Sequence, residues 1–137
     1  MEELILPQKD EAQVNMMNPL VWAYIGDSVY ELYVRNYLIN NSNAKVHELH
    51  VNAIKYVKAK AQAEILKIID TTLNEEEKNI VRRTRNTQNH HIPKNADPSD
   101  YMYATAFEGL IGYLYLNKRF DRLKEILNLI ENEYFKK

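Results

Sequence analysis

The chain has 137 residues, of which 45% are hydrophobic, so its size fits one domain with a real apolar core. It contains no cysteine, which excludes disulfides and thiolate chemistry. The formal net charge of −1 does not by itself favour nucleic-acid binding, so any such role must depend on where the charges lie. The start lacks a secretory pattern, and no window approaches the roughly 18 apolar residues that span a bilayer. We therefore expect one cytoplasmic domain over residues 1–137, without a membrane segment and with residues 1–14 as the candidate for a loose tail.

Few glycines and prolines, together with helical spacing of apolar residues, predict an all-α fold, a compact helical bundle. Asn18 before Pro19 is a typical helix start, and Asn74 before three glutamates is another, because such side chains cap free N–H groups and complement the helix dipole. Residues 86–97 are expected to form a loop. The five main helices that we expect span about residues 19–39, 44–69, 75–85, 98–116 and 120–135.

Two acidic residues lie in apolar, small-residue helical surroundings, Asp27 in the first main helix and Glu108 in the fourth. Carboxylates are almost never fully buried unless they are paired or bound to a metal, because losing their hydration is costly. Two such groups from distant segments suggest a shared cation. The alternatives are a solvent-facing or hydrogen-bonded Asp27 and a partly exposed Glu108.

Glycines stand beside both acids, at Gly26 and Gly109, although each lowers helix stability by about 0.5–1 kcal/mol relative to alanine. Their positions suggest that another backbone comes close, and two helices that cross at glycines would bring the carboxylates together. This geometry suits Mg²⁺, which keeps several waters and is often held by one or two protein carboxylates. Glu31, four residues after Asp27, either adds an outer contact to the metal or pairs with Arg35.

Two further aspartates, Asp97 and Asp100, precede Glu108 by eleven and eight residues. An intervening helix would place them more than about 10 Å away, so we do not expect them to share its metal. Asp97 is expected to cap a helix start, with a secondary metal or RNA-end role as the alternative.

A cationic and polar run extends from residue 82 to residue 94, while acidic residues concentrate elsewhere. Side chains of these types suit the phosphates and 2′-hydroxyls of an A-form duplex. The alternative is a solvated helix end whose arginines complement the dipole. The same choice, between an electrostatic track and a solvated face, applies to Lys55, Lys58, Lys60, Gln62 and Lys67 of the second helix. The residues that we expect to contact RNA are Arg82, Arg83, Arg85, Asn86 and Lys94.

The segments Ile25–Val29 and Phe107–Gly112 resemble the two halves of the ribonuclease III signature, and the small Mini-ribonuclease III group fits best. The likeness also covers residues 24–35, 58–62 and 105–116. It implies a bundle of the ribonuclease III catalytic-domain type that binds Mg²⁺, with Mn²⁺ as a substitute, through Asp27 and Glu108 as catalytic residues. It further implies an endoribonuclease that cuts both strands of double-stranded RNA, leaves 5′-phosphate and 3′-hydroxyl ends, and matures the large-subunit ribosomal RNA precursor.

The chain departs from longer ribonuclease III enzymes at Leu20, Ala23 and Thr105, where those enzymes carry acids, and these departures are typical of the Mini group. No segment remains for a separate RNA-binding domain, so the catalytic domain is expected to hold the duplex itself. Two alternatives are an inactive RNA-binding module and an all-α nucleotide pyrophosphohydrolase. The resemblance also implies a homodimer, which the aromatic first helix supports through Trp22, Tyr24, Tyr33 and Tyr37.

Overall fold

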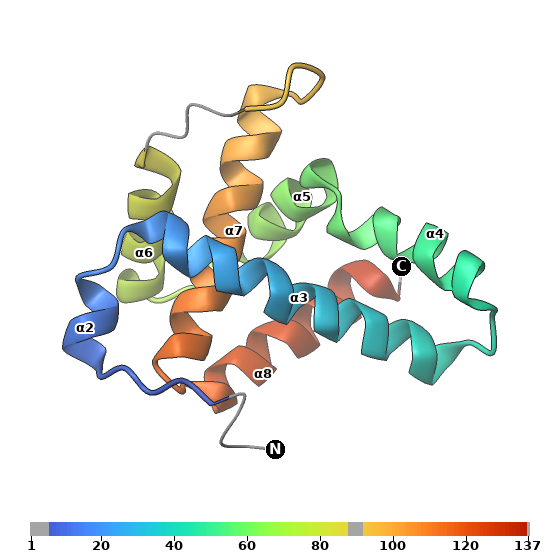
Figure 1. Ribbon diagram of the computed structural model, residues 1–137, viewed down its shortest axis with the longest axis horizontal. Coiled ribbons are helices and arrows are strands. Elements are labelled where there is room, and N and C mark those ends of the chain that lie inside the picture. The colour runs from blue at the N-terminus through green and yellow to red at the C-terminus, as the bar shows by residue number, and fades with distance from the viewer. Residues whose placement is uncertain (1–5, 88–91, 137) are drawn as a thin grey trace.

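A computed structural model describes residues 6–87 and 92–136, and it confirms the all-α prediction, since no strand occurs in these two ranges (Figure 1). A 3₁₀ turn, η1 (Asp70–Thr72), and a π-helical turn, η2 (Glu131–Phe135), extend two of the helices. The α-helices are α2 (Glu11–Asn15), α3 (Pro19–Asn41), α4 (Val46–Val57), α5 (Ala59–Ile69), α6 (Glu75–Asn86), α7 (Pro98–Leu116) and α8 (Phe120–Ile130).

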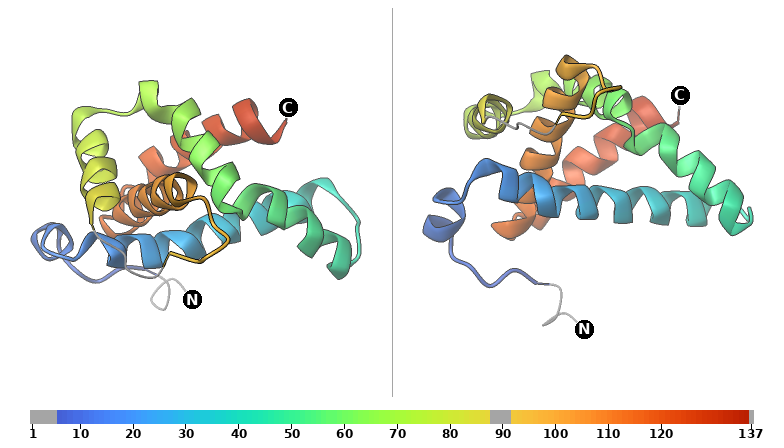
Figure 2. Two further views of the ribbon diagram at one scale, coloured as in Figure 1. Left: turned by 90° about the horizontal axis from the view of Figure 1, so that it is seen from above. Right: turned by 45° about the horizontal axis from the view of Figure 1, so that its top comes forward.

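Helix α7 is the central element, because it contacts α3, α5, α6 and α8. Helix α3 crosses α7, while α5 and α6 lie beside it (Figure 1). The C-terminal half of α3 and the helix α4 project together to one side, away from α2 and α6 (Figure 2). No helix in the described part of the chain is long and apolar enough to cross a membrane.

The expected helix starts are confirmed. The Asn18 side chain accepts a hydrogen bond from the backbone N–H of Leu20, and Pro19 occupies the first turn. Asn74 and Glu77 form a reciprocal capping box, in which each side chain accepts a hydrogen bond from the other residue's backbone N–H. These interactions within three residues of the chain mark the starts of α3 and α6.

The prediction of a single helix over residues 44–69 is wrong, because the helix is interrupted at Lys58, whose extended backbone (ψ 154°) separates α4 from α5. Two buried side chains donate hydrogen bonds to backbone carbonyl oxygens at the break. The Tyr30 hydroxyl donates to the carbonyl oxygen of Tyr56 at 2.8 Å, and Gln62 Nε2 donates to that of Val57, also at 2.8 Å. No proline or glycine marks this break, so the local sequence carries no signal for it.

The N-terminal residues pack more closely than the expected loose tail. Asp10 and Gln13 form a capping box at the start of α2, and Val14 is fully buried. The Trp22 indole N–H donates to the Val14 carbonyl oxygen at 2.9 Å, which ties α2 to α3. Residues 10–14 are therefore part of the packed structure, while residues 1–5 lie outside the described ranges.

The crossing of α3 and α7 depends on two glycines. A Cβ on Gly26 would lie 1.8 Å from the carbonyl oxygen of Glu108, and a Cβ on Gly112 would lie 1.8 Å from that of Trp22. No real side chain fits at such distances. Gly109 serves a different contact, since its Cβ would lie 2.5 Å from Thr84 Oγ1 of α6. The predicted close approach is thus confirmed, but Gly112 rather than Gly109 is the partner of Gly26.

Most aromatic residues of α3 belong to the core rather than to an outer surface. Trp22 is fully buried and packs edge-on against Tyr113, with ring centroids 5.1 Å apart. Tyr33 and Tyr37 pack against Phe135 within the main hydrophobic cluster. Of the four aromatic residues expected at a dimer surface, Tyr24 alone is largely exposed, at 81%.

We expect Gly26→Ala to lower the free energy of unfolding by about 3 kcal/mol or more, because the added methyl group forces the α3 and α7 backbones apart. Urea unfolding followed by circular dichroism measures this change. Ser28→Ala, at an exposed position of the same helix, is the matched control and should change stability by less than about 0.5 kcal/mol. Equal stability of the two variants would contradict the proposed tightness of the crossing.

Candidate functional site

Asp27 and Glu108 meet at the glycine crossing. Asp27 follows Gly26 on α3, and the Glu108 carbonyl oxygen lies directly opposite Gly26 on α7. Burial raises the pKa of the Glu108 carboxyl group, and the charge of Asp27 and a hydrogen bond with it raise it further, to about 8. At neutral pH and without a cation, the raised pKa favours the protonated form of Glu108, which can donate a hydrogen bond to Asp27. The prediction that the two acids come together is confirmed.

The two acids differ in their exposure, although both were expected in core surroundings. Asp27 is exposed and Glu108 is half-buried. On α3 the buried side is set by Trp22, Ala23 and Tyr30, which point toward α7 and the core. Asp27 lies at the edge of this face, so its carboxyl group reaches both Glu108 and solvent. The pair is consequently open to a ligand from outside.

A third polar group, Gln62 of α5, completes the site and was not expected there. Its side chain is buried, at 3% exposure, and Nε2 lies 3.4 Å from Glu108 Oε2 as a hydrogen-bond donor. This contact lowers the pKa of Glu108 but does not cancel the larger effect of burial. The sequence placed Gln62 in a lysine-rich helix and within the stretch 58–62 that resembles the ribonuclease III family, but nothing in its neighbours shows that it points inward.

Two of the other acids considered from the sequence make local contacts. Glu31 forms an exposed ion pair with Arg35 at 3.0 Å, which confirms the alternative to an outer metal contact. Asp97 caps α7 by accepting the backbone N–H of Asp100 at 3.0 Å, as expected. Among the described residues, no group of three or more histidine, cysteine, aspartate or glutamate side chains gathers. The acid site therefore consists of one carboxyl pair.

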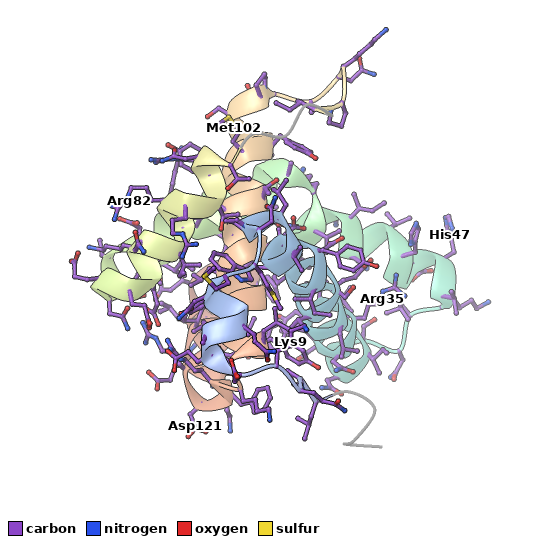
Figure 3. All side chains as sticks on the ribbon, turned by 60° about the vertical axis from the view of Figure 1, so that its left-hand side comes forward. Lys9, Arg35, His47, Arg82, Met102 and Asp121 are labelled. Atoms are coloured by element: carbon purple, nitrogen blue, oxygen red, sulfur yellow. The ribbon has the colours of Figure 1, made fainter. Side chains whose placement is uncertain are left out.

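The arginines of α6 divide into two kinds. Arg83 lies over the Trp22 ring at 4.9 Å and donates to the Asn15 carbonyl oxygen, so it links α6 to α2 and α3. Arg85 lies 5.9 Å from the Tyr103 ring of α7. Arg82 is exposed and projects from the outer side of α6 (Figure 3). Arg82 and Arg85 thus line the end of α6 that approaches the start of α7.

The remaining predicted RNA contacts lie in and before the connection to α7. Asn86 ends α6 and is exposed, and Lys94 is exposed in a turn before Asp97. Residues 88–91, including His90 and His91, lie outside the described ranges. The described part of this segment presents polar groups beside α7 without burying them.

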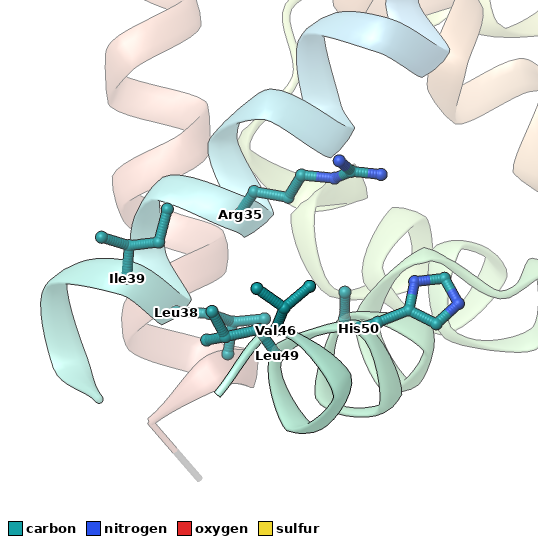
Figure 4. Close-up of a pocket in the computed structure, with 7 residues that line it drawn as sticks. Arg35, Leu38, Ile39, Val46, Leu49 and His50 are labelled. Carbon is teal, nitrogen blue, oxygen red and sulfur yellow. The ribbon is translucent and has the colours of Figure 1, made fainter. Parts of the chain in front are cut away.

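A separate hollow of about 210 Å³ lies between the C-terminal end of α3 and α4. Figure 4 shows its apolar floor with Arg35 and His50 at the sides. Arg35 follows Asp27 by eight residues, or about 12 Å of helix, so the hollow is distinct from the carboxyl pair.

The donor set at the crossing fits a small divalent cation. Two carboxylates in contact repel each other unless a proton or a cation lies between them. Mg²⁺ prefers oxygen ligands and keeps several waters, so two protein carboxylates suffice to hold it. Asp27 and Glu108 offer such oxygens at a site that reaches solvent.

Comparisons with known proteins give one consistent result. Residues 20–119 match the Ribonuclease III domain family. The Mini-ribonuclease 3 of Thermoanaerobacter sp. (strain X514) is 53% identical over 113 residues, covering 82% of this chain and 80% of that protein. The Mini-ribonuclease 3 of Clostridium tetani is 48% identical over 122 residues, covering 88% and 81%. A crystal structure of a protein from Fusobacterium nucleatum matches with a TM-score of 0.78 at 30% identity, covering 90% of this chain and 98% of that one.

The raised pKa of Glu108 predicts that the metal-free protein loses stability as the pH rises. A carboxyl group with a pKa above its unfolded value stabilises the fold fully below the unfolded pKa, and this contribution is lost as the pH rises through the folded pKa, here about 8. Urea unfolding in a chelator should therefore show lower stability at about pH 9 than at about pH 6. Glu108→Gln should remove most of this difference. An unchanged pH dependence in the variant would contradict the assignment.

Proposed function

The chain belongs to the ribonuclease III family and is an endoribonuclease, similar to the Mini-ribonuclease 3 proteins, and on this premise we propose that it cleaves double-stranded RNA with Mg²⁺ held by Asp27 and Glu108. The observation that carries the proposal is the contact of these two carboxyl groups at the α3–α7 crossing. Mn²⁺, which also accepts oxygen ligands, is the expected substitute. The family assignment leaves the nucleotide pyrophosphohydrolase alternative without support.

The chain's own groups prepare the site for hydrolysis. A bound Mg²⁺ supplies an activated water and positive charge for the attacked phosphodiester and the leaving 3′ oxygen. Asp27 is exposed, so it offers oxygens on the side from which a phosphate approaches. Glu108 must give up its proton to act as a ligand, and Gln62 Nε2 favours its charged form by donating to Oε2. The products are 5′-phosphate and 3′-hydroxyl ends.

The duplex is expected to run from the carboxyl pair toward the end of α6. Arg85 lies 5.9 Å from the Tyr103 ring, and Tyr103 precedes Glu108 by five residues, or about 7.5 Å of helix. Arg82, Asn86 and Lys94 are exposed nearby in the chain and are proposed as phosphate and sugar contacts. Arg83 packs on Trp22 and uses one guanidinium donor for the Asn15 carbonyl oxygen, and its exposed side chain adds positive charge to the same surface.

Cleavage of both strands requires two centres, which a symmetric homodimer provides. Helix α3 supports this assembly with exposed apolar side chains on its outer side, at intervals of three, eight and seven residues that keep them on one side of the helix. These exposed residues are Val21, Tyr24, Leu32 and Ile39. The proposed physiological substrate is the large-subunit ribosomal RNA precursor, because resemblance to the Mini-ribonuclease III group implies a role in its maturation.

We expect Asp27→Asn to abolish Mg²⁺-dependent cleavage of a long labelled RNA duplex while it preserves folding and dimerisation. The amide keeps the shape of the side chain but removes the charge that holds the cation. Gel analysis of cleavage, with and without Mg²⁺ and alongside single-stranded RNA, measures the effect. Asp121→Asn on the exposed surface of α8 is the matched control and should cleave like the unmodified protein.

The outcomes of this assay separate the alternatives. Duplex-specific, Mg²⁺-dependent cutting that Asp27→Asn abolishes supports the proposal. Duplex binding without cutting by the unmodified protein would favour the inactive RNA-binding module. Full activity of Asp27→Asn would overturn the role of Asp27.

We expect Arg82→Gln to weaken duplex binding to a similar degree for different RNA sequences, because phosphate contacts carry no sequence information. The slope of log binding constant against log salt should fall in magnitude by about 1, as for one lost phosphate contact. Filter binding in Ca²⁺ at several salt concentrations measures both quantities. Lys124→Gln removes the same charge from the exposed side of α8 and should leave the slope unchanged. Equal slopes for both variants would place the RNA elsewhere.

A further inference from the structure

Gln62 lies at the meeting point of α5, the α4–α5 break and the carboxyl pair. It is buried between the core residues Ala61 and Ala63, at 3% exposure. Its Nε2 atom donates to the Val57 carbonyl oxygen at 2.8 Å and approaches Glu108 Oε2 at 3.4 Å. One amide nitrogen therefore connects the helix break to the acid at the proposed metal site.

The orientation of this amide follows from its neighbours. Both groups that face Nε2, a carbonyl and a carboxyl oxygen, accept hydrogen bonds. Rotating the amide by half a turn would place Oε1 against the Val57 carbonyl oxygen and the Glu108 carboxyl oxygen. That orientation would lose both hydrogen bonds and add repulsion between oxygens. The nitrogen must therefore face Val57 and Glu108, and the oxygen must point to the remaining side.

The oxygen on that side has no donor within the described chain. Gln62 Oε1 is fully buried and has no hydrogen-bond partner among residues 6–87 and 92–136. Leaving a buried acceptor unpaired costs about 1–3 kcal/mol, and buried polar atoms nearly always find a partner. A donor from outside the chain, next to the Glu108 carboxyl group, would remove this cost.

The proposed cation brings such donors to this place. Mg²⁺ held by one or two carboxylates keeps several water molecules, and each of these waters carries two O–H donors. Groups beyond the direct ligands commonly orient those ligands and their waters. Gln62 can act in this way because Nε2 donates a hydrogen bond to Glu108, a proposed direct ligand, and Oε1 is free to accept one from a metal-bound water.

We infer that Gln62 is a positioning residue of the metal centre: Nε2 orients Glu108, and Oε1 accepts a hydrogen bond from a water of the Mg²⁺ hydration shell. This inference rests on the proposed function. The inference also relates the α4–α5 break to the site, because the interrupted helix leaves the Val57 carbonyl oxygen free to accept a hydrogen bond from the Gln62 amide. The residue acts through Glu108 and bound water and does not touch the RNA.

The test compares Mg²⁺ binding by the whole protein without RNA, measured by calorimetry, for the unmodified chain and Gln62→Met. Methionine preserves the unbranched shape but has neither donor nor strong acceptor. We expect Mg²⁺ affinity to fall about 10- to 100-fold, the usual effect of losing such a partner. The Mg²⁺ concentration for half-maximal cleavage should rise in parallel.

A matched control separates positioning from loss of structure. Tyr30→Phe removes the other side-chain donor at the α4–α5 break, which bonds to the Tyr56 carbonyl oxygen, without touching Glu108. We expect both variants to lower the melting temperature without Mg²⁺, while only Gln62→Met loses Mg²⁺ affinity. Equal Mg²⁺ affinity in both variants and the unmodified protein would overturn the inference.

A second variant, Gln62→Leu, keeps the experiment decisive if Gln62→Met does not fold. Leucine also lacks a donor and an acceptor, so Mg²⁺ affinity should again fall about 10- to 100-fold relative to the unmodified protein. Unchanged Mg²⁺ affinity would overturn the positioning role of Gln62. Failure of the unmodified protein to bind Mg²⁺ would instead overturn the proposed function itself.

Discussion

The contact between the backbones of α3 and α7 is the constraint on which the site depends. Gly26 meets the carbonyl oxygen of Glu108, and Gly112 meets that of Trp22, so each helix lies in the space that the other leaves open. A side chain at either glycine would increase the separation of the helices and draw Asp27 away from Glu108. The same crossing buries Trp22 against Tyr113, so the residues that stabilise the core also set the distance between the acids.

This closeness has an electrostatic cost, which a proton offsets in the metal-free protein. Burial and the charge of Asp27 make the charged form of Glu108 unfavourable, and its pKa rises to about 8. A divalent cation in the proposed site would replace the proton and bring two positive charges to the same place, which would offset the repulsion between the two carboxylates. Gln62 donates a hydrogen bond to Glu108 that favours its charged form.

The sequence predicted helix starts well and helix interruptions poorly. Asn18 and Asn74 act on N–H groups two or three residues away, so their effect is local and visible in the sequence. The break at Lys58 depends on hydroxyl and amide donors from Tyr30 and Gln62, which reach the freed carbonyls only in the folded chain. The packing of Arg83 on Trp22 is likewise a tertiary contact that no local pattern shows, while its predicted contact with RNA stays a prediction.

The sequence by itself determined the all-α class and the family. It also predicted that two backbones approach closely beside Asp27 and Glu108, because glycine is costly inside a helix unless a close contact requires it. Only the tertiary structure decided which apolar residues face inward, since α3 carries apolar residues on both its buried and its outer side. It also decided that Gly112 rather than Gly109 meets α3 and that Gln62 reaches Glu108. These facts follow from the angle and the register at which helices distant in the chain pack, and no short stretch of sequence contains that geometry.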